Sequence, residues 1–308
     1  MASLESILES VARSGNQWNL QVNRECEQAF TAQHKAKLTA ERTASATVTK
    51  NVKYGEHDRH RIDVYAPADA TERTAVVVYF HGGGFTAGDN DISDHLHSNI
   101  GYYFASNHVT CVLATYRLLP EARFPDGADD VARCLSWVSK HIGTYGGSPD
   151  SISAIGQSAG GAHLAMALFG AHSDLDDLAG LQSVIFQSVP FTYNLKLERR
   201  RANMAAYHTT EHDREILSNS AVEIFARSKW FEIGLDRKPN FYIMVAQNDS
   251  DEIVDANLEF VQQYRKKAKH LPLLEVLEGH NHVSYALSIG LRGDKMGPRL
   301  LDIIQRST

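Results

Sequence analysis

The chain of 308 residues has the length of one large domain, and its 43% hydrophobic and 22% charged residues are typical of a globular protein, which excludes disordered and fibrous classes. Its 31 basic and 37 acidic residues give a net charge of −6 without a basic block, which argues against nucleic acid and anionic membranes as partners. We expect a cytoplasmic protein for three reasons. The three cysteines are widely spaced, as in proteins of a reducing compartment, and no apolar run is long enough to span a membrane. The N-terminus carries glutamates where a signal peptide carries basic residues.

Residues 1–45 are predicted to be helical, because apolar residues such as Leu4, Ile7 and Val11 recur at helical spacing. Three strands then follow with no helix between them, which predicts an antiparallel start to a sheet: Val48–Tyr54, Arg61–Tyr65 and Ala75–Phe80. Strands and helices alternate in the rest of the chain. The further strands are expected at Val109–Tyr116, Ser151–Ile155, Ser183–Ser188, Asn240–Gln247 and Leu273–Leu277, and the helices at Asp129–His141, Ala159–Phe169, Asp255–His270 and Pro298–Gln305.

This alternation predicts a mostly parallel eight-stranded sheet with helices on both faces. Residues 191–236 interrupt it, because they are polar and carry helical patterns without a strand. Together with residues 1–45 they are expected to form a helical cap over the C-terminal edge of the sheet. The chain is therefore interpreted as a single domain, 1–308, with cap segments at about 1–45 and 191–236.

The pentapeptide Gly156–Gly160 has the pattern G-x-S-x-G, and it lies between a predicted strand and a helix of small residues. This is the setting of a nucleophile elbow, in which a tight turn exposes the serine and glycines let the strand and the helix approach closely. The pattern predicts Ser158 as a nucleophile. The alternative is a glycine-rich helix start with a capping serine.

The run His81–Phe85 contains three consecutive glycines directly after a predicted strand. Glycine allows successive backbone N–H groups to turn toward one point, where the carbonyl oxygen of a substrate becomes an oxyanion. Gly83 and Gly84, together with the N–H of Ala159, are the expected oxyanion hole. The alternative is a merely flexible loop.

A serine nucleophile needs a base, and the base needs an acid that orients it. Candidates follow two predicted strands in the order that this elbow requires, with Asp249, Asp251 and Glu252 after one strand and His280 and His282 after the next. The aspartates are favoured over Glu252, which points the opposite way in an extended loop. Solvated loop charges are the alternative for the carboxylates.

Histidine pairs raise the question of a metal site. His95 and His97 are separated by one residue, as are His280 and His282. Zinc sites need three or four protein ligands in firm geometry, and neither H-E-x-x-H nor C-x-x-C accompanies these pairs. No metal and no other cofactor is expected.

Several of these segments resemble one family. The runs His81–Phe85, Tyr116–Glu121, Tyr145–Asp150 and Gly156–Gly161 are similar to those of the α/β-hydrolase fold, and within it to the hormone-sensitive-lipase-like carboxylesterases and the kynurenine-formamidase-like group. The resemblance is dense from about residue 60 to 170 and thinner to about 290. It implies the same nucleophile and oxyanion hole, an acid near 251 and a histidine near 282. In one departure, Gln157 stands where the esterases often carry aspartate.

Within this resemblance we expect His282 to be the base, because such esterases place it about three residues after a glycine that closes the last strand, here Gly279. We expect Asp251 to be the acid. Asp255 precedes an apolar helical stripe and is assigned as a helix N-cap. Asp249 follows the strand directly, where aspartate commonly closes a local turn on its own backbone.

These residues predict a serine hydrolase that cleaves a small-molecule carboxylic ester through an acyl-enzyme. Two alternatives stay open: hydrolysis of an aryl formamide such as N-formylkynurenine by the same residues, and a non-catalytic small-molecule binder on this fold. Seven aromatic residues of the cap either line the pocket or attach the cap to the body: Trp18, Phe30, Phe191, Tyr193, Tyr207, Trp230 and Phe231. The natural substrate and the oligomeric state are not predicted.

Overall fold

The computed structural model describes residues 3–37, 43–93, 95–170, 178–232 and 238–307. An eight-stranded sheet with the order β1-β2-β4-β3-β5-β6-β7-β8 forms its centre. β2 is antiparallel to both of its neighbours and the remaining pairs are parallel, so the predicted antiparallel start and mostly parallel sheet are confirmed. The strands are β1 (Ala46–Lys53), β2 (Arg61–Pro67), β3 (Thr74–Phe80), β4 (Thr110–Ala114), β5 (Gly147–Gln157), β6 (Leu181–Gln187), β7 (Asn240–Asn248) and β8 (Leu273–Asn281).

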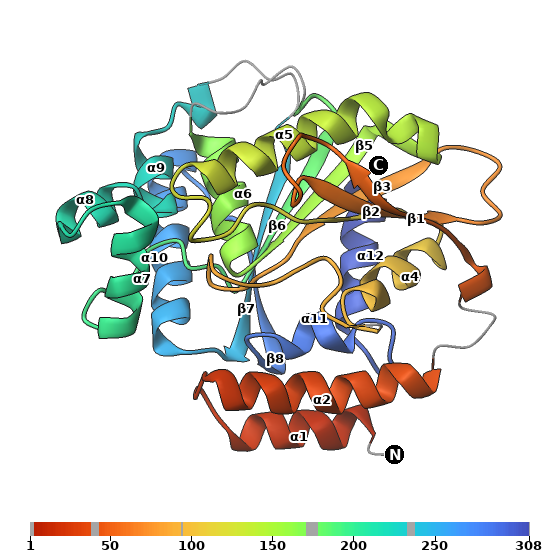
Figure 1. Ribbon diagram of the computed structural model, residues 1–308, viewed down its shortest axis with the longest axis horizontal. Helices are drawn as coiled ribbons and strands as arrows, with labels where there is room; N and C mark the ends of the chain where they lie inside the picture. Colours follow the sequence, from red (N-terminus) through yellow and green to blue (C-terminus); the bar gives the residue numbers. More distant parts are fainter. Residues whose placement is uncertain (1–2, 38–42, 94, 171–177, 233–237, 308) are drawn as a thin grey trace.

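The sheet separates two hydrophobic clusters, because successive side chains of a strand point to opposite faces. Val76 and Val78 of β3 pack with α5, α6 and α10, whereas Val77 and Tyr79 pack with α4, α11 and α12. The prediction of helices on both faces is confirmed (Figure 1). The helices of the first face are α5 (Asp126–His141), α6 (Ala159–Phe169) and α10 (Asp251–Ala268), and those of the second are α4 (Ser98–Ala105), α11 (Ser284–Ser288) and α12 (Met296–Ser307).

Two groups of helices flank this arrangement. Figure 1 shows α1 (Leu4–Arg13) and α2 (Leu20–Lys37) together near the arrowheads of β7 and β8. The second group, α7 (Glu198–His208), α8 (Asp213–Ser218), α9 (Ala221–Arg227) and a 3₁₀ turn at Trp230–Glu232, contains no strand within the described residues. Residues 1–2, 38–42 and 233–236 of the two predicted cap segments lie outside the described residues. None of the described helices combines the length and apolar character needed to cross a bilayer.

The boundary between β7 and α10 differs from the prediction. β7 continues to Asn248 and α10 begins at Asp251, so two residues separate them. Asp255, expected to be the N-cap, lies inside the helix, and extended Ser250 precedes its first turn instead. Acidic residues at 251 and 252 suit that first turn because they face the positive end of the helix dipole. This earlier start decides which acidic side chain reaches the neighbouring strand.

Candidate active site

A tight turn joins β5 to α6 at Ser158, which has the backbone angles φ 50° and ψ −122°. The turn brings strand and helix so close that two of its glycines have no room for a side chain. A Cβ on Gly156 would lie 2.5 Å from the Cα of Gly161, and a Cβ on Gly160 would lie 2.3 Å from the backbone oxygen of His81. The strand–turn–helix arrangement expected for the pentapeptide is therefore present, and it holds Ser158 in a conformation that non-glycine residues rarely adopt.

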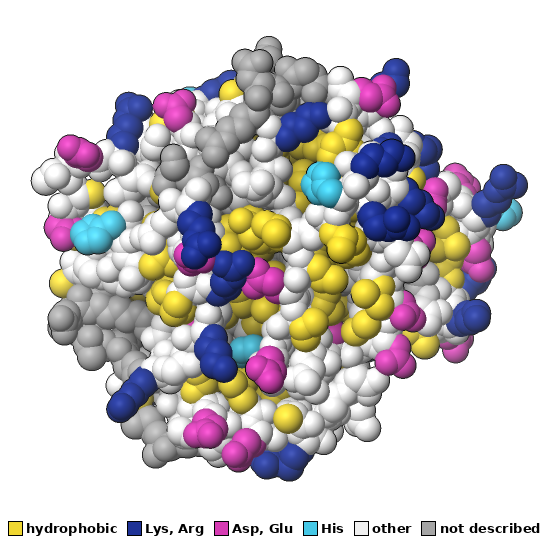
Figure 2. Space-filling model, turned by 180° about the vertical axis from the view of Figure 1, so that it is seen from behind, with side chains coloured by type: hydrophobic (Ala, Val, Ile, Leu, Met, Phe, Trp, Pro, Cys, Tyr) yellow, Lys and Arg dark blue, Asp and Glu magenta, His cyan; other side chains and the backbone are white. Residues whose placement is uncertain are grey.

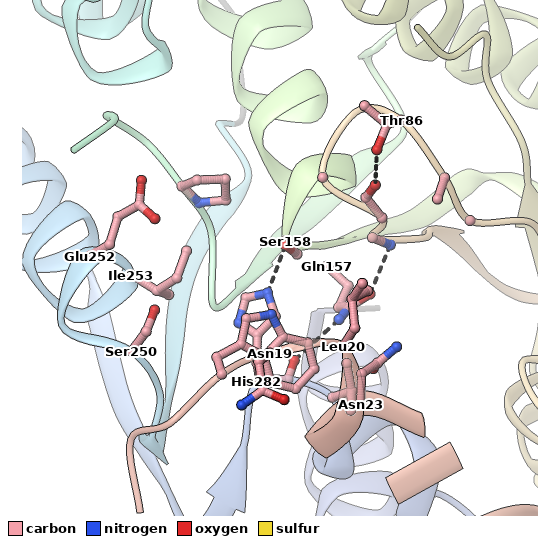
Figure 3. Close-up of a pocket in the computed structure, with 18 of the residues that line it drawn as sticks. Asn19, Leu20, Asn23, Thr86, Gln157, Ser158, Ser250, Glu252, Ile253 and His282 are labelled. Carbon is pink, nitrogen blue, oxygen red and sulfur yellow. Dashed lines mark hydrogen bonds between the residues drawn. The ribbon is translucent and has the colours of Figure 1, made fainter. Parts of the chain in front are cut away.

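Three side chains from three strand ends form a continuous chain of hydrogen bonds. His282 Nε2 lies 2.8 Å from Ser158 Oγ (Figure 3), and on the other side of the ring His282 Nδ1 lies 2.7 Å from Asp249 Oδ1. The three residues are buried, with only 7%, 6% and 2% of Ser158, His282 and Asp249 exposed. A carboxylate that accepts from Nδ1 leaves Nε2 as the acceptor for the serine O–H, which is the arrangement that activates a serine.

The expectation that Asp251 orients the histidine is corrected by this geometry. Asp251 is exposed at the first residue of α10, and its Oδ1 accepts a 2.8 Å hydrogen bond from Asn16 Nδ2. Asp249 is the first residue after β7, beside the end of β8, where Asn248 pairs with Asn281. Asp249 Oδ1 also accepts from Ser250 N at 3.3 Å, so the predicted local turn forms without preventing the contact with the histidine.

Glu252, the third acidic candidate, joins α10 to α7. It accepts two hydrogen bonds from Arg200, at 2.8 and 3.0 Å, and a third from the backbone N–H of Asn194 at 3.1 Å. Asp251 and Glu252 thus tie the start of α10 to the α1–α2 loop and to the segment that begins α7. Neither contacts His282.

The two candidate histidines occupy different environments. His280 is turned away from Ser158, with its Nδ1 3.0 Å from Ser284 Oγ. Burial is the main cause that lowers the pKa of His280 to about 4, so its ring is neutral at neutral pH. The histidine against Ser158 is His282, as expected.

The glycine loop after β3 lies beside Ser158. Gly83 has φ +137°, and a Cβ there would lie 1.9 Å from the backbone oxygen of Ala87, so glycine is required. Gly84 has φ +61°, and a Cβ there would meet nothing within 4 Å. Both glycines line the same cavity as Ser158, while Ala159 is the buried first residue of α6. The oxyanion hole expected from the N–H groups of Gly83, Gly84 and Ala159 stays a prediction.

Gln157 connects this loop to the histidine loop. Its Oε1 accepts from Gly82 N at 2.7 Å, and its Nε2 donates to the backbone oxygen of His282 at 3.3 Å (Figure 3). A neutral amide suits the position because it accepts on one side and donates on the other, whereas a carboxylate can only accept. The sequence analysis identifies Gln157 as a departure from the related esterases, but its hydrogen bonds to Gly82 and His282 are not predictable from the sequence.

A cavity of about 1100 Å³ opens over these residues. Its walls come from the glycine loop, from the α1–α2 loop, and from the starts of α7 and α10. The Trp18 ring lies 4.9 Å from the His282 ring, and the side chain of the next residue, Asn19, accepts from Gln21 N and Val22 N and so begins α2. The α1–α2 loop therefore places an aromatic wall over the histidine.

Of the seven cap aromatics, only Trp18 lines this cavity. The other six pack in or against the described hydrophobic clusters, as the alternative predicted: Phe30, Phe191, Tyr193, Tyr207, Trp230 and Phe231. Asparagines and a few apolar residues of the wall were not singled out from the sequence, because loop residues reach the cavity only through tertiary packing. Among the described residues, no three His, Cys, Asp or Glu side chains are grouped as a metal site requires.

Residues 62–198 match the family model BD-FAE. Carboxylesterase NlhH of Mycobacterium tuberculosis is 30% identical over 176 residues, 57% of this chain and 50% of that protein. A probable isoprenylcysteine alpha-carbonyl methylesterase of Arabidopsis thaliana is 23% identical over 274 residues, 84% of this chain and 56% of that protein. The chain thus spans about half the length of these curated relatives.

Two solved structures are similar over almost the whole chain. Esterase B from Lactobacillus rhamnosis, inhibited by a tributyrin phosphonate, has a TM-score of 0.72 at 17% identity and covers 99% of this chain and 96% of its own. A bacterial heroin esterase has a TM-score of 0.67 at 17% identity, and the match covers 98% of this chain and 96% of that protein. These comparisons confirm the α/β-hydrolase fold and the resemblance to carboxylesterases that the motifs between residues 60 and 170 predicted.

Proposed function

We propose that this protein, which has the α/β-hydrolase fold, is a serine esterase that cleaves carboxylic esters through an acyl-enzyme. The observation that carries the proposal is the chain of hydrogen bonds from Ser158 through His282 to Asp249 beneath a large cavity. Its curated relatives include a carboxylesterase and a methylesterase, which supports the ester as substrate.

In the first half-reaction Ser158 Oγ attacks the acyl carbon while His282 Nε2 takes the serine proton. The carbonyl electrons move onto the carbonyl oxygen, which accepts hydrogen bonds from the N–H groups of Gly83, Gly84 and Ala159. Asp249 stabilises the imidazolium that forms. The tetrahedral intermediate then collapses, the bond to the alcohol oxygen breaks, and Nε2 returns the proton to the leaving alcohol.

In the second half-reaction water replaces the alcohol. His282 Nε2 takes a proton from the water as its oxygen attacks the acyl-enzyme, and the same N–H groups stabilise the second oxyanion. Collapse of this intermediate breaks the bond to Ser158 Oγ, which regains its proton from Nε2. The acid leaves, and no cofactor is required at any step.

The two helical segments act as the cap of a single domain in this proposal. The loop between α1 and α2 and the start of α7 both line the cavity. The α1–α2 loop is hydrogen-bonded to Asp251 at the start of α10, and α7 is hydrogen-bonded to the next residue, Glu252. The cap therefore shapes the binding site for the group on one side of the ester bond. The apolar and amide side chains of its wall suit a small molecule with both polar and apolar parts.

A fluorophosphonate probe and two substrates test the proposal. We expect the folded protein to be labelled at Ser158, to hydrolyse p-nitrophenyl butyrate, and to lose both properties on heating. Hydrolysis of N-formylkynurenine in preference to the p-nitrophenyl ester would replace the esterase by an aryl formamidase. Failure of the folded protein to react with the probe would instead favour the non-catalytic binder.

A further inference from the structure

Arg59, in the turn between β1 and β2, has a guanidinium that is largely withdrawn from water. On the face shown in Figure 2, lysine and arginine side chains project from the surface, several of them beside acidic groups. The Arg59 side chain is instead only 20% exposed, although it does not line the active-site cavity. A charged group is costly to bury unless it is paired and hydrogen-bonded, so the acceptors around Arg59 indicate its role.

Two backbone oxygens accept hydrogen bonds from Arg59. Its Nη2 donates to the oxygen of Gly88 at 2.8 Å, and its Nε donates to the oxygen of Tyr116 at 2.7 Å. Tyr116 Oη in turn donates to the backbone oxygen of His81 at 2.6 Å, and the rings of Tyr116 and His81 stack with their centroids 4.5 Å apart. His81 and Gly88 are the two ends of the glycine loop, residues 81–88. Arg59 therefore holds one end of this loop directly and the other end through Tyr116.

The carboxylate of Asp89 fixes the guanidinium from another side. Asp89 Oδ2 accepts from Arg59 Nη1 at 3.3 Å, and both carboxylate oxygens accept from Arg61 Nη2 at 2.9 Å. The backbone oxygen of Asp89 lies 2.6 Å from His97 Nδ1. A carboxylate shared by two arginines and partly removed from solvent holds its partners more firmly than a single surface ion pair does. Arg59 is thus itself held in one position.

His81, at the start of the loop, receives a third contact from Arg59. His81 is fully buried, and its Nδ1 lies 2.6 Å from the backbone oxygen of Gly82, so Nδ1 carries the proton. His81 Nε2 is then the accepting nitrogen, and it lies 3.4 Å from Arg59 Nη2, which can only donate. Burial is the main cause that lowers the pKa of His81 well below 6.5, and the charge of Arg59 acts in the same direction. The guanidinium therefore favours the neutral tautomer that donates to Gly82.

The hydrogen bond from His81 fixes the peptide unit between Gly82 and Gly83. In a trans peptide the C=O and N–H groups point in opposite directions, so a carbonyl held toward His81 directs the N–H of Gly83 away from it. The next peptide unit is held in the same way, because the oxygen of Gly83 accepts from the backbone N–H of Ala87 at 3.0 Å. This bond sets the direction of the N–H of Gly84. These two N–H groups are donors of the proposed oxyanion hole.

We infer that Arg59 is a positioning residue for the proposed ester hydrolysis, which holds the glycine loop so that the N–H groups of Gly83 and Gly84 point at the developing oxyanion. The inference rests on the proposed function, because the oxyanion forms only in that reaction. Arg59 does not touch the substrate and acts through the two ends of the loop. Donors that are held in place stabilise the transition state more than the bound ester, so Arg59 contributes to kcat and hardly to KM.

Steady-state and burst kinetics with p-nitrophenyl butyrate test this inference. For Arg59→Ala we expect kcat to fall about 100-fold, as when one oxyanion donor is lost, with KM changed less than about twofold. Both half-reactions use the same donors, so the burst rate and the steady-state rate should fall together. Arg59→Lys keeps the charge but lacks the planar fork that reaches several acceptors at once, so its kcat should lie between those of the wild type and Arg59→Ala.

Chemical rescue and a matched variant separate positioning from loss of structure. Guanidinium chloride below its unfolding concentration should raise the kcat of Arg59→Ala at least about tenfold over the same concentration of sodium chloride, because the free cation can donate to the vacated oxygens. Arg299→Ala removes another ion-paired arginine, which contacts Glu275 and Asp302 and does not line the cavity, and it should keep the wild-type kcat. Circular dichroism and urea unfolding establish that each variant is folded.

A folded Arg59→Ala variant with wild-type kcat, a loss confined to KM, or a loss of kcat that guanidinium does not restore would each overturn the inference. If Arg59→Ala does not fold, Arg59→Lys decides, and wild-type kcat in that variant would overturn it. The proposed function is tested separately on the wild type. A wild-type protein that neither reacts with the fluorophosphonate nor hydrolyses the ester would overturn both, whereas the results on the Arg59 variants overturn the inference alone.

Discussion

Two parts of the chain place the candidate active-site residues at the edge of the sheet in different ways. In residues 74–170 the glycine loop and the serine turn are short contiguous motifs, and steric limits at their glycines hold the backbone. In residues 240–288 single side chains are placed by where β7 ends, where α10 begins and where β8 ends. The comparison teaches that a contiguous motif can be located from the sequence, whereas an isolated acidic residue requires the exact ends of its neighbouring elements.

The largest effect is expected in the first part, at the serine. Ser158→Ala removes one oxygen and leaves the backbone unchanged, so kcat for ester hydrolysis should fall by a factor of about 10⁶ without loss of the fold. Burst and steady-state kinetics with p-nitrophenyl butyrate measure it, with circular dichroism as the control for folding. A variant that keeps more than about one tenth of wild-type turnover would contradict the assignment of the nucleophile.

The second part is tested by the two aspartates. Asp249→Asn lets His282 adopt the tautomer that donates to Ser158, so kcat should fall by about 10⁴. Asp251→Asn, two residues away, should retain most of its kcat, because that carboxylate contacts Asn16 and not the histidine. The reverse result would show that the loop after β7 turns elsewhere. In that case Asp251, the acid expected from the sequence, would be the residue that orients His282, and the difference between the two parts would disappear.

The histidines of the same part provide a second matched pair. His282→Gln removes the base and should lower kcat by a factor of about 10⁴ or more. His280→Gln should be far milder, because His280 bonds Ser284 rather than Ser158. A dead His280 variant beside an active His282 variant would reverse the assignment of the base.

Buried neutral histidines in both parts should make the fold sensitive to acid. Burial is the main cause that lowers the pKa of His163, on α6, and of His280, on β8, from 6.5 to about 4. Between these values the unfolded chain binds protons that the folded protein does not, so stability should be complete above about pH 6.5 and should fall as the pH drops toward 4. Urea unfolding between pH 4 and 8 measures this loss of stability. The variants His163→Gln and His280→Gln should each reduce the slope of the unfolding free energy against pH. A pH-independent midpoint would contradict it.

The smallest effect is expected where the two parts meet, at Gln157. Gln157→Glu keeps the bond from Gly82 N but cannot donate to the backbone oxygen of His282, so kcat should fall about tenfold. Gln157→Met, of similar length, loses both bonds and should fall further. We would measure kcat, KM and the pH profile of each variant. A change in kcat or in the pH profile of the folded variant reports on the positioning of the loops, and loss of stability is measured separately by unfolding. Wild-type kcat in the Met variant would show that the bridge does not position them.

The error over the acid had a local cause. Asp255 precedes an apolar helical stripe, a pattern that predicts a helix start there, but α10 begins at Asp251 and contains Asp255. A helix that starts earlier leaves only Asp249 and Ser250 in the loop, and Asp249 lies next to the strand that leads to the histidine. Hydrophobic periodicity locates the middle of a helix well, but its ends are set by backbone hydrogen bonds that a pattern of apolar residues does not contain.

The sequence by itself determined the class of fold, the approximate positions of the eight strands, the serine turn and the glycine loop. These features are local, because the period of apolar residues and the steric freedom of glycine are carried by neighbouring residues. Only the tertiary structure decided that Asp249 faces His282, that Gln157 bridges two loops, and that Trp18 reaches the cavity. Each of these contacts joins segments far apart in the chain, and its geometry depends on how the helices pack against the sheet.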